Sequence, residues 1–143
     1  MNDAHPDAKS AYTPEAREKI KRTVAARGLA GLANDTKWNK LLAAMRERAD
    51  WRPSFRWKCV DGSPSGWDVE WFCHLPFPLI SVEWMDIGFL QEIHEHRLTA
   101  PALIDHSPWI EAILQQARFD YRKGRDTFRL FGYAPRNTEL FDE

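Results

Sequence analysis

The chain has 143 residues, of which 43% are hydrophobic, 13% aromatic and 29% charged, and its formal net charge at pH 7 is −1. This length is typical of one folded domain, and the hydrophobic fraction is sufficient for a buried core. Because the charges nearly balance, they give no general attraction to nucleic acid or to an acidic membrane, and we expect neither as a partner.

The N-terminal residues are polar and contain no apolar run. We therefore expect residues 1–12 to be disordered, without a secretory signal or a membrane-spanning segment, and we expect the protein to be cytoplasmic. Residues 13–135 are assigned to a single domain and residues 136–143 to a C-terminal tail. No feature of the sequence fixes the oligomeric state.

Two helices are predicted in the first third of the chain. The first begins at Thr13-Pro14-Glu15, which combines an N-cap, a proline suited to the first helical turn and an acid near the positive helix end, and Gly28 is placed to end it. The second follows Asn34-Asp35-Thr36, where we expect Asp35 to cap the free amides. Its core stripe has helical spacing and consists of Trp38, Leu41, Leu42 and Met45.

Alternating apolar residues then predict strands. Phe55, Trp57 and Cys59 alternate before a Gly-Ser-Pro-Ser-Gly turn, and alternation resumes in the segment 67–73. Pairing the two apolar faces would set Trp57 opposite Trp71. In that register Cys59 and Cys73 lie too far apart for a disulfide, so both are expected to be buried free thiols.

The rest of the chain predicts a third strand at Leu79–Trp84, a partly ordered connection at Gly88–Asp105, a helix starting at Ser107-Pro108 and a closing hairpin within residues 119–133. Consecutive strands joined by short turns favour antiparallel pairing. The predicted fold class is α+β, with an antiparallel sheet of about five strands and about three helices packed on one face.

The opposite face of this sheet is the first candidate site. If Trp57, Trp71 and Trp84 point at the helices, the residues between them point outward. We then expect an acidic surface with an aromatic anchor, able to recognise a basic protein partner, and composed of Asp68, Glu70, Phe72, Glu83 and Asp86. In the predicted register Lys58 lies opposite Glu70 and Arg56 opposite Phe72, and the alternative interpretation is that solvated charge pairs across the strands only keep the face polar.

A second candidate site is the string His94-Glu95-His96, with His106 nearby. Imidazole and carboxylate groups together can bind a metal ion, so a metal-assisted hydrolase that uses His94, His96 and His106 is the alternative function. The sequence has no P-loop, dinucleotide-binding fingerprint or nucleophile elbow, and we expect no cofactor.

Four motifs, Asn34–Asn39 (NDTKWN), Trp67–Phe72 (WDVEWF), Val82–Ile87 (VEWMDI) and Phe128–Tyr133 (FRLFGY), resemble those of a small bacterial family of single-domain proteins of unknown function. The resemblance implies a compact cytoplasmic protein with no established catalytic residues. In type, the chain is similar to the immunity proteins that bacteria pair with secreted toxins. We therefore expect a non-enzymatic binding protein, an immunity-type inhibitor that covers a basic toxin domain with its acidic face and the flanking segment 88–106.

Overall fold

The computed structural model describes residues 5–143, which form an α+β fold around an antiparallel sheet. All pairings in this sheet are antiparallel, which confirms the predicted fold class. The sheet has four strands, in the order β2 (Phe55–Cys59), β3 (Val82–Gly88), β7 (Thr127–Phe131) and β6 (Tyr121–Lys123).

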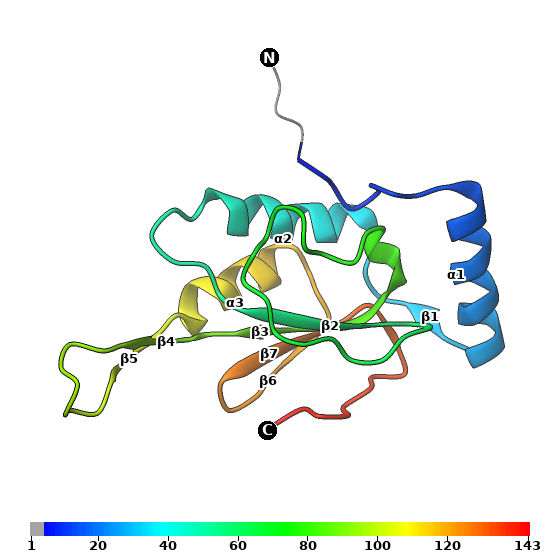
Figure 1. The fold of residues 1–143 in the computed structure, drawn as a ribbon. Coiled ribbons are helices and arrows are strands. Elements are labelled where there is room, and N and C mark those ends of the chain that lie inside the picture. Colours follow the sequence, from blue (N-terminus) through cyan, green and yellow to red (C-terminus); the bar gives the residue numbers. More distant parts are fainter. Residues whose placement is uncertain (1–4) are drawn as a thin grey trace, which may run out of the picture.

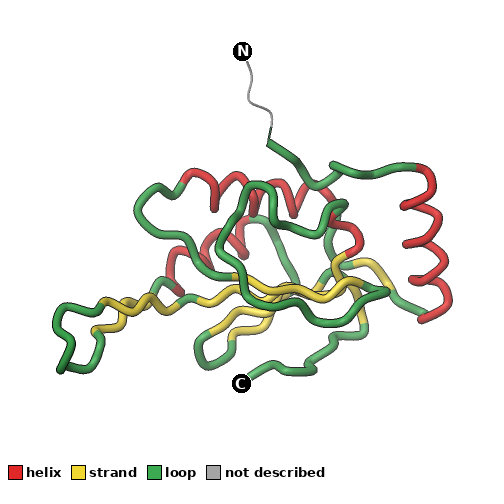
Figure 2. Tube along the Cα trace, viewed as in Figure 1, coloured by secondary structure: helices red, strands yellow, loops and turns green. Residues whose placement is uncertain are grey.

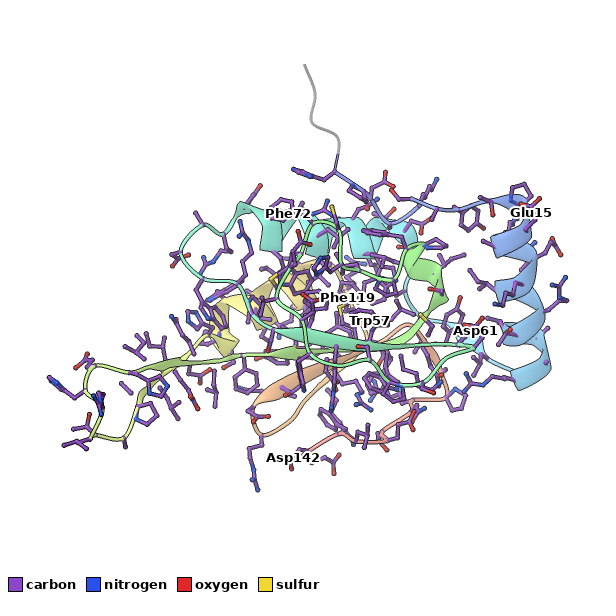
Figure 3. All side chains as sticks on the ribbon, viewed as in Figure 1. Glu15, Trp57, Asp61, Phe72, Phe119 and Asp142 are labelled. Carbon is purple, nitrogen blue, oxygen red and sulfur yellow. The ribbon has the colours of Figure 1, made fainter. Side chains whose placement is uncertain are left out.

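Two helices cover one face of the sheet. Figure 1 shows α2 (Asp35–Glu47) and α3 (Ser107–Gln116) over the same face, whereas α1 (Pro14–Arg27) stands at the side of the sheet. The core lies between these helices and the sheet, and Trp57 and Phe119 point into this layer in Figure 3. The predicted α2 stripe is buried, as are the apolar side chains that the sheet turns toward it, namely Phe55, Met85, Ile87, Phe128 and Leu130.

The helix ends follow local rules. Thr13 caps α1 by accepting a hydrogen bond from the Ala16 amide, and Gly28 ends the helix in the left-handed conformation at φ 64°, both as predicted. At α2 the prediction was wrong by one position. The side chain of Asn34 accepts from the Lys37 amide, and Asp35 is the first helical residue.

The remaining strands form two short ribbons. β1 (Ala30–Gly31) pairs with β8 (Tyr133–Ala134), and a 3-10 turn, η1 (Leu79–Ser81), leads into β3. β4 (Leu90–Ile93) pairs with β5 (Ala102–Asp105) in an arm, residues 90–105, that projects from the body where only a connection was expected (Figures 1 and 2). Among the helices of residues 5–143, none is both long enough and apolar enough to span a bilayer.

The segment 67–73 is not a strand, contrary to the sequence prediction. It forms a loop with one isolated bridge, between Phe55 and Asp68, and Trp57 pairs with Met85 instead of Trp71. Both cysteines are free, but Cys59 is only partly buried and Cys73 is exposed.

The N-terminal segment has more structure than expected. The Ala8 amide donates to Asn39 Oδ1 and its carbonyl oxygen accepts from the Leu79 amide, and the Ala8 side chain is buried. Residues 1–4 of the predicted disordered segment 1–12 lie outside the described residues.

A bulge in β3 changes which side chains reach the outer face, the side of the sheet turned away from α2 and α3. Lys58 pairs with Trp84 and Cys59 with Val82, so Glu83 is the extra residue on β3. Trp84 therefore lies beside Arg129 on the outer face and not under the helices as predicted. Gly132 follows the last residue of β7 at the same place, and a Cβ atom there would collide with the carbonyl oxygen of Val82.

Candidate binding site

The outer face carries a buried ion-pair network. Three neighbouring strands place Arg56, Asp86 and Arg129 in one row across the sheet. Arg129 makes a bidentate contact, with Nε 2.7 Å from Asp86 Oδ1 and Nη2 2.9 Å from Oδ2, and Arg56 Nε lies 2.9 Å from the same Oδ2. The side chains of Asp86 and Arg129 are both 0% exposed. The Asp86 carboxylate therefore binds two guanidinium groups, that of Arg129 fully buried and that of Arg56 at the edge of the interior.

The C-terminal tail, residues 136–143, covers this network. Arg129 Nη1 donates to the carbonyl oxygens of Asn137 (3.0 Å) and Glu139 (2.6 Å), and Arg56 Nη2 donates to that of Leu140 (2.9 Å). Figure 3 shows Asp142, near the end of the tail, on the side of the sheet opposite the helices. Main-chain oxygens of the tail thus accept hydrogen bonds from the guanidinium N–H groups that do not contact Asp86.

Glu83 belongs to a second buried cluster beside this row. Its carboxylate accepts hydrogen bonds from Arg27 (2.7 and 3.0 Å), Lys58 (2.7 Å) and Asn137 (3.1 Å). Burial alone would raise the pKa of Glu83, but these hydrogen bonds outweigh it and lower the pKa to about 2. The prediction that Glu83 and Asp86 are exposed was therefore wrong, because the tail and the basic side chains enclose them.

Asp68 and Glu70 shape the loop that replaces the predicted strand. Asp68 Oδ1 accepts from the amides of Val69 and Glu70, and its Oδ2 lies 3.0 Å from His74 Nδ1. Glu70 Oε1 accepts from three successive amides, those of residues 72, 73 and 74. Hydrogen bonds to backbone amides, first of Glu70 for Asp68 and first of Cys73 for Glu70, lower the pKa of each carboxyl group. Much of their acceptor capacity is used within the loop.

Phe72 does not join these acids on one surface. Figure 3 shows it beside α2, on the helix side of the molecule. Its ring centroid lies 5.5 Å from Arg46 Cζ, 5.2 Å from Arg52 Cζ and 4.7 Å from the ring of His5. The five residues proposed from the sequence are therefore spread over three places: the buried outer face, the loop 67–74 and the helix side.

The structure does not bring the three candidate metal ligands together. His94 and His96 lie in the arm between β4 and β5, whereas His106 lies at the start of α3. Within residues 5–143, no three His, Cys, Asp or Glu side chains are grouped closely enough to hold a metal ion.

His106 has a complete set of contacts of its own. Its ring stacks on Trp51 at a centroid distance of 4.0 Å. The Trp109 indole N–H donates to Nδ1 at 2.8 Å, so the ring proton of the neutral form lies on Nε2, which is 2.8 Å from Gln91 Oε1. Burial, followed by the charge of Arg48, lowers the pKa of His106. These contacts tie the base of the arm to α3.

The arm carries several exposed apolar side chains. All four residues of β5 are exposed, and Leu98 near the tip has 98% of its surface open. Leu103 is 58% and Ile104 40% exposed, on opposite sides of the ribbon. An exposed apolar ribbon of this kind marks an interaction site or an aggregation hazard.

An open pocket of about 420 Å³ lies where the arm joins the body, and we call it the arm pocket. Its wall includes Trp67, which is 48% exposed although it is a large aromatic side chain. Leu90 and Leu103 add apolar side chains to the lining, and Glu92 and Asp126 add carboxylates. The pocket thus combines apolar walls with two carboxylates.

Sequence reasoning missed both the arm and the pocket. The available signal was two short apolar segments, 90–93 and 102–104, on either side of a polar stretch, which is a hairpin pattern. The His and Glu residues between them favoured a loop. The alternation in segment 67–73 predicts a strand, which does not indicate that Trp67 is exposed.

Comparison with known proteins places the chain in a family without an assigned activity. A family model described as "Family of unknown function (DUF6678)" matches residues 20–137, and the chain belongs to this family. No curated protein and no solved structure matches it.

Proposed function

We propose that this member of a family of unknown function is a non-enzymatic protein-binding module that engages its partner through the arm, residues 90–105. The observation that carries the proposal is the exposure of Leu98, Leu103 and Ile104 on a ribbon that projects from the body. The charged residues suggested by the sequence are poorer candidates, because Glu83 and Asp86 are enclosed.

Binding by the arm would use ordinary interface physics. Burying apolar side chains contributes about 25 cal/mol per Å² removed from water, and a strand edge can add main-chain hydrogen bonds to an extended partner segment. β5 has no second neighbouring strand within residues 5–143, so its outer edge is open to such a segment. The base of the arm is held by His106, which positions the ribbon before the partner arrives.

The form of this function that we propose is immunity-type inhibition of a basic toxin domain in the cytoplasm. The arm would lie across the partner's active site and exclude its substrate, and no reaction would be catalysed. The segment 88–106, expected from the sequence to flank the contact surface, becomes the contact surface itself. The tail and the outer face would serve stability rather than binding.

Photo-crosslinking inside the native cell tests the binding role and captures a partner whose identity is not yet established. A photoreactive amino acid replaces Leu103 in one variant and Glu15, an exposed residue of α1, in the control. We expect a discrete covalent adduct with one protein from position 103 and none from position 15. Equal labelling from both positions, or no adduct from the arm, contradicts the proposal.

The inhibitor form is tested separately. The adduct partner, purified alone, should lose its activity on addition of one equivalent of this protein. The variant Leu103→Asp should restore that activity, because it places a charge in the contact, while its urea midpoint should remain that of wild type, because residue 103 is exposed. If the partner keeps full activity in the complex, this protein is a binding module but not an inhibitor.

A further inference from the structure

We propose that the arm pocket is a recognition site for an arginine side chain on the surface of a partner protein. The proposal rests on the binding function above and specifies the chemistry of the partner at one position. Three features of the pocket support the proposal: the exposed Trp67 ring, the two carboxylates in its lining, and the apolar walls formed by Leu90 and Leu103.

Trp67 offers an aromatic face to a cation. Its ring already has one guanidinium group over it, with Arg56 Cζ 4.8 Å from the centroid, and 48% of the residue remains open to solvent. A cation over a tryptophan face contributes about 0.5–1 kcal/mol at an exposed site. A planar guanidinium stacks on such a ring better than an ammonium group does, which favours arginine over lysine.

Two carboxylates supply the opposite charge. Glu92 lies on β4 and Asp126 precedes β7, and neither has a lysine or arginine within salt-bridge distance among residues 5–143. Within the same part of the chain, the one ionic contact of Glu92 is with His94, at 3.4 Å, between two side chains that are both largely exposed. Thr127 Oγ1 lies 3.0 Å from Asp126 Oδ1 and donates to it, which orients this carboxylate. Acceptors for a guanidinium are therefore present and incompletely used.

The floor of the pocket depends on Gly88. A Cβ atom at this position would lie 2.9 Å from Ser54 Oγ and 3.9 Å from Trp67 Cζ3. A side chain at residue 88 would collide with Ser54, so glycine allows Ser54 and Trp67 to pack closely at this end of the pocket. Leu90 and Leu103 form apolar walls that suit the methylene stem of an arginine side chain.

The charges near the pocket do not cancel this preference. The cation over the Trp67 ring, Arg56, is already bound to the Asp86 carboxylate and to the tail carbonyl of Leu140. Asp105, which faces the same side of the arm as Glu92, adds a further negative charge near the pocket. Hydrogen bonds from Ser107 and, to a lesser degree, the charge of Lys123 lower the pKa of Asp105, so a cation also lies near this side of the arm. The charged residues that line the pocket itself, Glu92 and Asp126, are both acidic.

NMR titration of the full chain with a short peptide tests the proposal. The probe is acetyl-Gly-Arg-Gly amide, and the control peptide has citrulline, the neutral isostere, in place of arginine. We expect saturable shifts of the Trp67 indole N–H and the Gly88 amide with the arginine peptide, and affinity at least about fivefold weaker with the citrulline peptide. Unsaturable shifts, or equal affinity for both peptides, overturn the proposal.

A matched pair of double variants locates the charge. Glu92→Gln with Asp126→Asn should weaken binding of the arginine peptide at least about fivefold, whereas Glu15→Gln with Glu47→Gln, an equal charge change on two exposed helical positions, should leave it within about twofold. An equal loss of affinity in both double variants would indicate a general electrostatic attraction between the peptide and the protein, and would overturn the proposal.

Two further outcomes are distinguishable. Concentration-dependent shifts of the Trp67 and Gly88 signals without peptide would mean that a second copy of this chain fills the pocket, which also overturns the proposal. If the peptide fails to bind but the Leu103 crosslink forms, the arginine site is refuted and the binding function stands. If the peptide binds at the pocket but no crosslink forms, the arginine site stands and the arm-mediated function is refuted.

Discussion

Asp86 is expected to be the most sensitive charged position in the chain. The substitution Asp86→Asn keeps the size of the side chain and removes its charge, so Arg129, which is 0% exposed, loses its ionic partner. Removing one partner of a buried ion pair costs about 3–5 kcal/mol, because the remaining charge stays desolvated. Arg56 loses its partner as well, but it is 20% exposed and can reach water.

The assay is thermal denaturation followed by tryptophan fluorescence. For a domain of this size, 1 kcal/mol shifts the melting temperature by roughly 3–4 °C, so we expect Asp86→Asn to melt roughly 10–20 °C lower than wild type. The matched control is Glu143→Gln. Glu143 pairs with Arg122 at 2.7 Å, but the two side chains are 65% and 46% exposed, and such a surface pair contributes at most about 1 kcal/mol.

A double variant separates burial of charge from loss of packing. Replacing both partners, Asp86→Leu with Arg129→Met, leaves no unpaired charge in the interior and should cost less than Asp86→Asn alone. The reasoning is refuted if Asp86→Asn costs less than about 1 kcal/mol, since a desolvated guanidinium without its carboxylate should destabilise the fold by more than that. It is also refuted if the double variant is less stable than both wild type and Asp86→Asn.

Three further predictions test neighbouring features. Glu83→Gln should destabilise the protein at pH 7, and because the folded pKa of Glu83, about 2, lies below its ordinary value of 4.5, its difference from wild type in urea midpoint should shrink between pH 4.5 and pH 2. A constant difference would contradict the ion-pair assignment. In thermal denaturation, Gly132→Ala should lower the free energy of unfolding by about 1–3 kcal/mol or more, because the added Cβ collides with the Val82 carbonyl oxygen. Gly66→Ala, with open space around residue 66, should lower it little in the same measurement. Nitrogen chemical shifts of His106 should show the Nε2-protonated form and a titration midpoint below 6.5, and a Nδ1-protonated ring would refute the Trp109 contact.

The helices were predictable because their signals are local. A cap, a proline in the first turn, a left-handed glycine and an apolar stripe all lie within one segment, and the structure follows them at α1 and α2. The predicted cap of α2, Asp35, is one residue away from the observed cap, Asn34, and both residue types are good caps. β2 and the closing hairpin were also found, since alternation is a property of one strand.

Strand pairing was not predictable in the same way, because it is decided between distant segments. The alternation of Trp67 to Cys73 fits a strand, but the side chains of Asp68 and Glu70 accept amide hydrogen bonds there and stabilise turns in place of a ladder. Val82–Gly88 takes the central position, between β2 and β7. The bulge at Glu83 then turns Trp84 to the outer face, and no sequence pattern announces a bulge.

The enclosure of the outer face depends on a segment that has no periodic pattern. Asn137, Glu139 and Leu140 contact Arg129 and Arg56 through main-chain carbonyl oxygens, which every residue has, so these contacts leave no sequence pattern. The side chain of Asn137 adds one hydrogen bond, to Glu83. The face gathers four basic side chains, Arg27, Arg56, Lys58 and Arg129, around two carboxylates, and the tail oxygens accept the surplus donors. Glu83 and Asp86, which the sequence suggests as parts of a functional surface, thereby stabilise the fold together with Arg129. The candidate contacts then fall to the exposed arm and to Trp67, whose binding roles the crosslinking and titration experiments test directly.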